Sequence, residues 1–170
     1  MFYIPRFVKS LDGLWLYRAV IRRLSQLKES GGADVVDAHF GYPEGIGSTI
    51  AARRLGIPIF VTLRGFEAEY LDKPLIGDQI RHVLRNADGL ICVGHFLKKL
   101  AVQNGADSDR IRVIHNAIDR TSFFPADKII ARRNLGLPDE GPIIVSVGHL
   151  VSRKRHHILI RAFAELIKIR

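Results

Sequence analysis

Cysteine is almost absent from this sequence: the one cysteine, Cys92, lies inside the apolar run 90–93. A single thiol excludes an intramolecular disulfide, and a thiol in such a run is usually a small core residue rather than a nucleophile or ligand. Apolar runs are short as well, because none approaches the roughly 18 residues of a membrane span. The N-terminus lacks the basic and apolar regions of an export signal. These absences favour a cytoplasmic protein.

The sequence motifs of several cofactor sites are also missing. Gly41, Gly45 and Gly47 have the wrong spacing for a dinucleotide-binding G-x-G-x-x-G loop, and there is no P-loop. Among the seven histidines no pair has the His-Glu-x-x-His spacing of a zinc site. His156 and His157 are adjacent, so they cannot face one site on a helix. We therefore expect neither a metal nor a cofactor.

Negative charge is scarce at the two ends of the chain. The formal net charge is +9, with six Lys/Arg against two Asp/Glu in residues 1–30, nine against four in residues 126–170, and eleven of each between. A nucleic-acid-binding protein usually interleaves basic residues with exposed aromatic residues along one element, and this pattern is not found. Nucleic acid is therefore disfavoured, whereas phosphate or anionic lipid remains open as a partner.

Strand and helix patterns alternate along the first two thirds of the chain. A basic amphipathic helix is expected over 10–29, where Leu14, Tyr17, Ile21 and Leu24 recur at helical spacing. Short β-branched runs then predict strands, and the segments between them predict helices. The strands are expected at 33–38, 58–63, 89–93 and 111–114, and the helices at 43–55, 76–86 and 95–103. This order predicts an α/β fold with a doubly wound parallel sheet that helices cover on both faces.

The regular pattern ends after residue 115. Residues 1–115 are expected to form a Rossmann-like domain, and 116–141 to form a linker with a short helix near 129–135. Residues 142–170 are expected to begin a second domain, with a buried strand at 142–148 and a helix from His156 onward. One strand and one helix cannot bury a core alone, so this arrangement predicts further sequence beyond the chain.

Several of these segments carry a family resemblance. They resemble, in order, the motifs of the retaining GT-B glycosyltransferases of family four, and the similar segments are 34–45, 55–65, 87–93, 111–125, 145–154 and 159–163. The resemblance implies transfer of a sugar from a nucleoside-diphosphate sugar to a glycan, a lipid-linked sugar or a small molecule. It also implies that an initial strand with a Gly-rich loop and later units with a paired-glutamate motif are missing. We therefore expect the isolated chain to be inactive.

The turn after the predicted strand 142–148 is the candidate donor site. Gly148 permits close backbone approach, and the cations that follow suit a pyrophosphate. In the family that the chain resembles, an arginine usually stands at the position of His149 and clamps the donor diphosphate together with the residue at Lys154. The resemblance implies that these cations also stabilise the charge developing on the leaving group, so Lys154 is a candidate catalytic residue. Arg153 could take over part of that role, and Arg155 stands where the family usually has glycine. The alternative interpretation is a solvated basic turn.

Polar residues follow the ends of the first two predicted strands, where doubly wound folds bind ligands. Arg64 is the candidate catalytic residue of this edge, because many members of the family carry a histidine there near the reacting sugar. A surface ion pair of Arg64 with Glu67 or Glu69 is the alternative, and His39 could equally be a hydrogen-bonded structural histidine. Asn116 and Asp119 are expected to cap a turn. The candidate acceptor-side residues are His39, Tyr42, Glu44, Gly65 and Glu67.

Two other functions remain open from the sequence. A basic membrane-surface or interaction module would rest on the amphipathic helix 10–29, which could bring the protein to the inner face of a membrane. A nucleotide-sugar epimerase or a phosphorylase of the same fold would have different linker and second-domain motifs.

Overall fold

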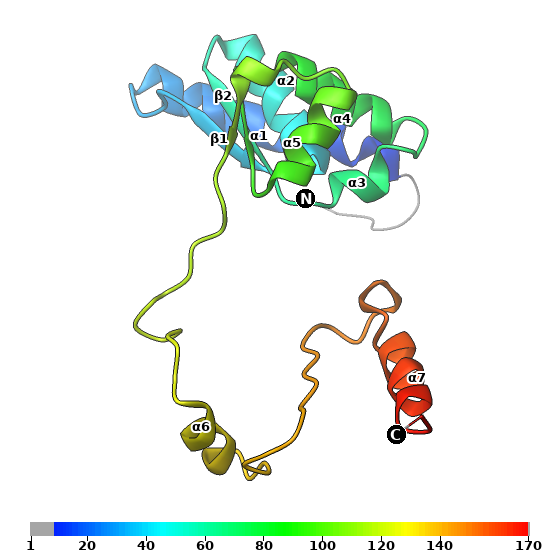
Figure 1. Ribbon diagram of the computed structural model, residues 1–170. Helices are drawn as coiled ribbons and strands as arrows, with labels where there is room; N and C mark the ends of the chain where they lie inside the picture. Colours follow the sequence, from blue (N-terminus) through cyan, green and yellow to red (C-terminus); the bar gives the residue numbers. More distant parts are fainter. Residues whose placement is uncertain (1–8, 170) are drawn as a thin grey trace. The chain divides into compact units, whose positions relative to one another are not determined.

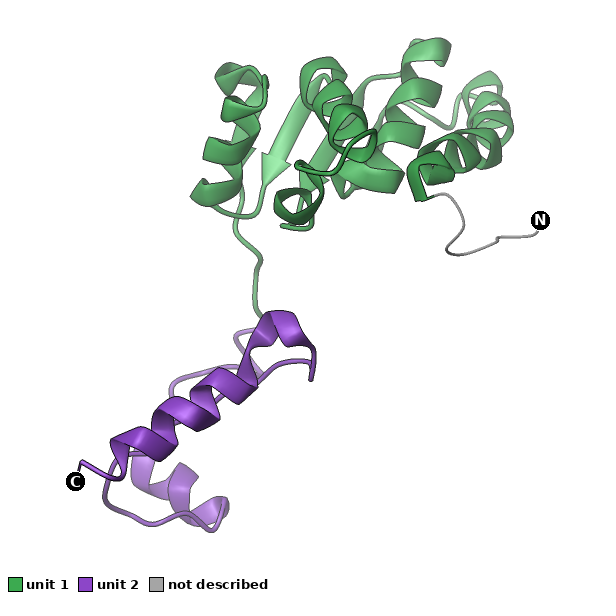
Figure 2. Cartoon of the chain, turned by 90° about the vertical axis from the view of Figure 1, so that its right-hand side faces the viewer, with its two compact units in different colours: residues 1–118 green, residues 119–170 purple. Residues whose placement is uncertain are grey.

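A computed structural model describes residues 9–169 of the chain (Figure 1). Residues 1–8, on which the prediction about export partly rests, and residue 170 lie outside the described residues. The chain divides after Ile118 into two compact units (Figure 2). This division puts most of the expected linker in the second unit.

The first unit is built on a four-stranded parallel sheet in the order β1-β2-β3-β4. Its register pairs Ala38 with Val61, Thr62 with Ile91, and Cys92 with Val113. The strands are β1 (Val36–His39), β2 (Ile59–Leu63), β3 (Gly89–Cys92) and β4 (Ile111–Val113). The prediction of an α/β fold with a parallel sheet is confirmed, and each strand falls within three residues of its expected start.

Helices fill the segments between the strands, as the apolar periodicity predicted. The helix expected at 76–86 is α4 (Ile76–Asn86), and the helix expected at 95–103 is α5 (His95–Gln103). The irregular turn η2 (Gly41–Gly45) precedes α2, and its Tyr42–Pro43 peptide bond is cis. The remaining elements of this unit are η1 (Lys9–Leu11), α1 (Asp12–Glu29), α2 (Ile46–Leu55), α3 (Glu67–Tyr70) and η3 (Ser108–Arg110).

The core lies between one face of the sheet and the crossover helices. Ile59, Val61, Leu63, Leu90, Cys92 and Ile111 are at most 2% exposed, and helical Ile80, Val83 and Leu84 join them. Burial raises the pKa of the Cys92 thiol to about 11, so this thiol is the neutral core residue expected from the sequence.

The opposite face of the sheet differs from the expectation of helices on both faces. Asp37, Phe60 and Arg112 alternate with the core residues along their strands and are exposed, so no described element covers them. The physical reason is the strand order: sequential parallel strands joined by crossovers of one hand place the crossover helices on the same face.

The basic helix α1 packs along α2, and its Leu24 also contacts the core. The two helices approach closely at glycines, because a Cβ on Gly47 would lie 2.9 Å from both the Gly13 carbonyl oxygen and the Leu16 side chain. Tyr17 accepts a hydrogen bond from Arg54 of α2 at 3.3 Å. Leu14, which was expected in the packed face, is 40% exposed.

The second unit holds two helices, α6 (Lys128–Asn134) and α7 (His156–Leu166), and the short turn η4 (Ser152–Lys154). Asp127 caps α6 by accepting from the amides of Ile129 and Ile130. The buried strand expected at 142–148 is wrong: the segment forms no strand, and Val145 and Val147 are 75% and 91% exposed. A strand needs a neighbour for its backbone groups, and the described second unit offers none.

Candidate functional site

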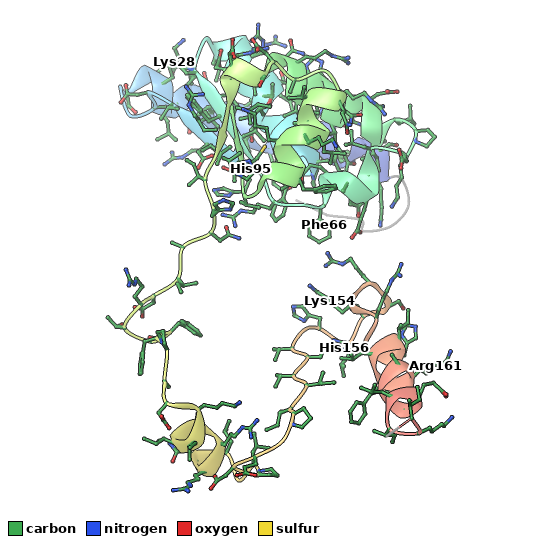
Figure 3. All side chains as sticks on the ribbon, viewed as in Figure 1. Lys28, Phe66, His95, Lys154, His156 and Arg161 are labelled. Carbon is green, nitrogen blue, oxygen red and sulfur yellow. The ribbon has the colours of Figure 1, made fainter. Side chains whose placement is uncertain are left out.

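The carboxyl ends of the four parallel strands bring distant segments of the first unit to one edge of the sheet. Loops 40–45 and 64–67 follow β1 and β2, and the segments 93–95 and 114–116 follow β3 and β4. In Figure 3, His95 and Phe66 both lie along the lower side of the first unit, away from Lys28. Ligands of open parallel α/β sheets bind at this edge, so it is the candidate functional site.

A buried carboxylate joins the first two loops. Glu67 is 2% exposed, and its Oε1 accepts from the amide of Gly41 at 2.8 Å. Its Oε2 accepts from the amide of Gly65, also at 2.8 Å. Two backbone donors compensate for the removal of this charge from water. Glu67 was expected to face the opening or to pair with Arg64 on the surface, but its side chain instead fixes the positions of both loops.

Arg64 lies beside His39, as the strand pairing predicts. Its Nε donates to Nδ1 of His39 at 2.9 Å, and its Nη1 lies 3.5 Å from Oδ1 of Asn116. The other imidazole nitrogen, Nε2, is 3.3 Å from a carboxylate oxygen of Asp37. Because Nδ1 accepts, the proton of a neutral His39 belongs on Nε2, where Asp37 can accept it. The structure therefore brings together Arg64 and His39, which the sequence singled out for this edge, and adds Asp37 and the expected turn residue Asn116 to them.

Asp119 caps the turn that begins the second unit, as expected. Its carboxylate accepts from the hydroxyl and the amide of Thr121 at 2.6 and 2.9 Å, and from the hydroxyl of Ser122 at 2.7 Å. Hydrogen bonds from Thr121 first, and then from Ser122, lower the pKa of Asp119 to about 2. Asn116, which was expected to cap the same turn, instead places its side-chain oxygen near Arg64.

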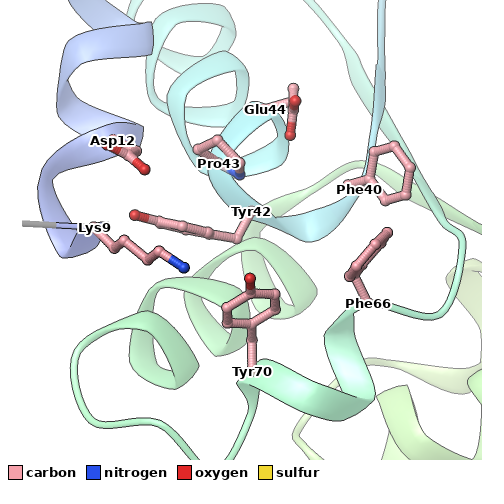
Figure 4. A pocket seen from close by; sticks show the side chains of 8 residues that line it. All are labelled: Lys9, Asp12, Phe40, Tyr42, Pro43, Glu44, Phe66 and Tyr70. Atoms are coloured by element: carbon pink, nitrogen blue, oxygen red, sulfur yellow. The ribbon is translucent and has the colours of Figure 1, made fainter. Parts of the chain in front are cut away.

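A pocket of about 400 Å³ opens beside the loops after β1 and β2 (Figure 4). Four aromatic rings form a continuous series in it: Phe40 and Phe66 are 5.6 Å apart, Phe66 and Tyr70 6.5 Å, and Tyr70 and Tyr42 6.3 Å between centroids. The lining residues are Lys9, Asp12, Phe40, Tyr42, Pro43, Glu44, Phe66 and Tyr70. Of the expected acceptor-side residues, Tyr42 and Glu44 are thus in the pocket.

The hydroxyl of Tyr42 is held in a dry position at one end of this pocket. Burial first, and then the negative charge of Asp12, raises the pKa of Tyr42 to about 12. The hydroxyl lies near the first amides of α1 but makes no well-formed hydrogen bond to any described group. It is therefore a neutral phenol at physiological pH, and its oxygen is shielded from solvent.

Two histidines that the sequence did not single out lie at the ends of β3 and β4. The rings of His95 and His115 meet edge to face, with centroids 5.8 Å apart. Nδ1 of His115 is 3.1 Å from the carbonyl oxygen of Val93. They could have been found from the sequence, because each comes within two residues of the end of a predicted strand. No group of three or more potential metal ligands occurs among residues 9–169.

The expected donor-site residues cluster within the second unit. The side chain of Lys154 runs past Gly148, whose added Cβ would lie 3.5 Å from Cγ and Cδ of Lys154. Figure 3 shows Lys154 in the turn η4 and His156 at the start of α7. Nδ1 of His156 lies 3.0 Å from the Ser146 hydroxyl. Arg155 has φ 54°, the left-handed conformation that favours glycine. His149 and Arg153 are exposed on the same turn.

The sheet and the edge residues define the class of protein as a Rossmann-like parallel α/β domain, and comparison with known proteins gives the family. The chain belongs to Glycosyltransferase Family 4, whose profile it matches over residues 2–122. It is 29% identical over 164 residues to a protein of Acidothermus cellulolyticus named D-inositol 3-phosphate glycosyltransferase, covering 91% of this chain and 36% of that protein. A protein of the same name from Mycolicibacterium vanbaalenii is 30% identical over 165 residues, with 90% and 36% covered.

A solved structure has a similar fold. Alr3699/HepE of Anabaena, crystallised in complex with UDP-glucose, matches with a TM-score of 0.52 at 17% identity, over 69% of this chain and 32% of that one. At this identity the likeness concerns the fold alone. The chain thus spans about a third of the length of the relatives that it matches. Within residues 9–169, no helix has the length and hydrophobicity needed to cross a membrane.

Proposed function

We propose that the chain is the acceptor-side domain, with the beginning of the donor-side domain, of a glycosyltransferase that uses a nucleoside-diphosphate sugar and retains the anomeric configuration. The observation that supports this most is the family match over residues 2–122. The similar fold of a protein crystallised with UDP-glucose supports a nucleotide-sugar donor. The relatives are named for D-inositol 3-phosphate, a phosphorylated polyol, and this supports an acceptor with a hydroxyl-bearing ring.

On the donor side, Lys154 and Gly148 would hold the diphosphate, with His149 and Arg153 beside them. In the transfer, the bond between the anomeric carbon and the diphosphate oxygen breaks, and that oxygen keeps the electron pair. The acceptor oxygen bonds to the anomeric carbon, and its proton passes to the diphosphate oxygen that leaves. A cation at the diphosphate stabilises the charge that develops on the leaving group. The side-chain cations supply this stabilisation, so the proposal does not call on a metal ion.

On the acceptor side, Arg64 would present its guanidinium to a phosphate oxygen or an acceptor hydroxyl. His39 and Asn116 orient that guanidinium from two sides. Glu67 acts indirectly, because it sets the loops that carry Gly41 and Gly65. Tyr42 and Glu44, which line the pocket, would contact the acceptor itself.

The proposal is tested with the polypeptide that the continuous reading frame around these 170 residues encodes. It is incubated with UDP-, GDP- and ADP-sugars and a panel of sugar and polyol acceptors, and release of the nucleoside diphosphate and the product's anomeric configuration are measured. Acceptor-dependent release is the expected result. The 170-residue chain serves as the control and should show no turnover, and transfer with inverted configuration or none at all would reject the proposal.

A specific feature of α1 also favours a second activity, reversible attachment to an anionic membrane at its cytoplasmic face. Trp15 is 54% exposed and Leu14 40% exposed, whereas Gly13 and Leu16 of the same helix approach Gly47 of α2. Arg18, Arg22 and Arg23 are exposed on the same helix. Apolar and cationic groups together on one exposed helix face suit a membrane interface.

A further inference from the structure

We propose that the aromatic pocket beside β1 and β2 binds an uncharged sugar ring, so that the acceptor is a glycan residue without phosphate at the bound position. This inference rests on the proposed function, which assigns the pocket to the acceptor. The pocket's volume of about 400 Å³ lies within the range of about 300–1,000 Å³ that small-molecule sites span.

The shape of the lining suits a pyranose. A pyranose has faces of C–H groups and a rim of hydroxyls, so it needs flat apolar surfaces with hydrogen-bonding groups around them. The rings of Phe40, Phe66, Tyr70 and Tyr42 provide the flat surfaces in one continuous series. In Figure 4 the hydroxyl of Tyr70 points toward the ring of Tyr42, and Phe66 and Phe40 continue the series on the other side.

The charges of the lining favour hydroxyl groups over phosphate. The carboxylates of Asp12 and Glu44 lie on the rim, where they can accept from sugar hydroxyls, and Lys9 is the one cation among the described lining residues. Like charges would repel a phosphate brought close to the two carboxylates.

A ring bound in the pocket would lie beside His39 and Arg64, the candidate residues at the sheet edge. Phe40 directly follows His39 at the end of β1, and Phe66 lies two residues after Arg64 at the end of β2. Phe40 holds a positive φ of 69°, which side-chain-bearing residues rarely adopt. The loop that imposes this conformation is fixed by the buried Glu67. The pocket wall is therefore held in place by the same carboxylate that sets the sheet edge.

The test measures binding to the 170-residue chain, so it needs neither donor nor turnover. Methyl glucoside and glucose 6-phosphate form a pair that differs in charge, and ligand-observed NMR with competition gives their relative affinities. Methyl glucoside should bind, and Phe66→Ala and Tyr70→Leu should each weaken binding about fivefold. Phe96→Ala is the control, because Phe96 is 67% exposed on α5. A double Asp12→Asn and Glu44→Gln variant should reduce the preference for the uncharged sugar.

Two further arms separate the sources of the sugar. Methyl glucoside stands for a free glycan end, and octyl glucoside below its micelle-forming concentration stands for a lipid-linked sugar. Octanol that competes as well as octyl glucoside would overturn the proposal, because the pocket would then be a lipid site. Tighter binding of glucose 6-phosphate, or sugar binding that Phe66→Ala and Tyr70→Leu leave unchanged, would also overturn it. Sugar binding in the pocket without transfer by the longer polypeptide would reject the proposed function alone.

Discussion

The carboxylate of Glu67, in the loop after β2, accepts a hydrogen bond from the amide of Gly41, in the loop after β1, at 2.8 Å. Its second oxygen binds the amide of Gly65, so one buried side chain spans the edge where the candidate residues lie. The edge of the sheet is thus held by a tertiary contact in addition to the strand pairing.

Glu67→Gln should destabilise the first unit. A glutamine has one acceptor oxygen, so the substitution would leave one buried amide facing an NH₂ group, at a cost of about 1–3 kcal/mol. The measurement is urea denaturation followed by circular dichroism. Asp72→Asn makes the matching change at an exposed residue of the same loop region and should cost little. Equal urea midpoints for the two variants would show that Glu67 does not stabilise the first unit.

His39 should be present as one tautomer, with its proton on Nε2. Arg64 donates to Nδ1, so nitrogen-detected NMR of the histidine side chains should show His39 with a bare Nδ1 and a proton on Nε2. Arg64→Gln should remove this preference or shift the Nδ1 resonance, whereas Arg81→Gln, on α4, should leave it as it is. A His39 protonated on Nδ1 would contradict the hydrogen bond.

Much of this fold could be predicted from the sequence, and the failures have physical reasons. Helix α4 begins and ends where expected, because its apolar residues repeat at helical spacing and bury one side. The burial of Glu67 could not be predicted, since a charged side chain is normally exposed and its two amide donors come from separate loops. Phe66 and Tyr70 were missed because the four-residue helix α3 is too short to show periodicity. The strand expected at 142–148 failed because apolar composition does not supply a pairing partner.

Alkaline titration should report the environment of Tyr42. Its pKa in the folded chain is raised to about 12 from an ordinary value of 10, chiefly by burial. Folding therefore favours the neutral phenol: its contribution to stability is fully present below pH 10 and is lost as the pH rises from 10 through 12. Absorbance of the phenolate should show a late step in the titration, which Tyr42→Phe removes. Tyr17→Phe, outside the pocket, should leave that late step in place.

In the polypeptide from the longer reading frame, Lys154→Ala should lower transfer by tens-fold or more. Loss of one charge-assisted contact to a developing leaving group costs on the order of 2–4 kcal/mol. Lys99→Ala, an exposed lysine on α5, is the control and should keep full activity. His149→Arg should be neutral or improve activity, because a guanidinium stays charged and can bind a phosphate with two donors. If Lys154→Ala left the kinetics of transfer unchanged, Lys154 would not be part of the donor site.

The basic face of α1 should bind anionic vesicles in a salt-dependent way. Arg18 lies over the ring of Trp15, with its guanidinium carbon 5.6 Å from the ring centroid, so the exposed aromatic ring and the cation occupy one surface. Each basic residue near an anionic surface contributes about 1 kcal/mol of attraction, which is enough for reversible binding by Arg18, Arg22 and Arg23 together. Screening over a Debye length of roughly 10 Å at 0.1 M salt should weaken it.

Co-sedimentation of the 170-residue chain with phosphatidylserine-containing vesicles measures this attachment. Binding should decline as salt rises, and it should be lost when Arg18, Arg22 and Arg23 are all replaced by glutamine. Replacing Lys98, Lys99 and Arg112 by glutamine removes the same formal charge from α5 and β4, and it should have little effect if the attraction is local to α1. Trp15→Ala should weaken binding at every salt concentration, since it removes the apolar part of the contact. If the two triple variants behave alike, the attraction comes from net charge rather than from this helix, and α1 serves only to pack against α2.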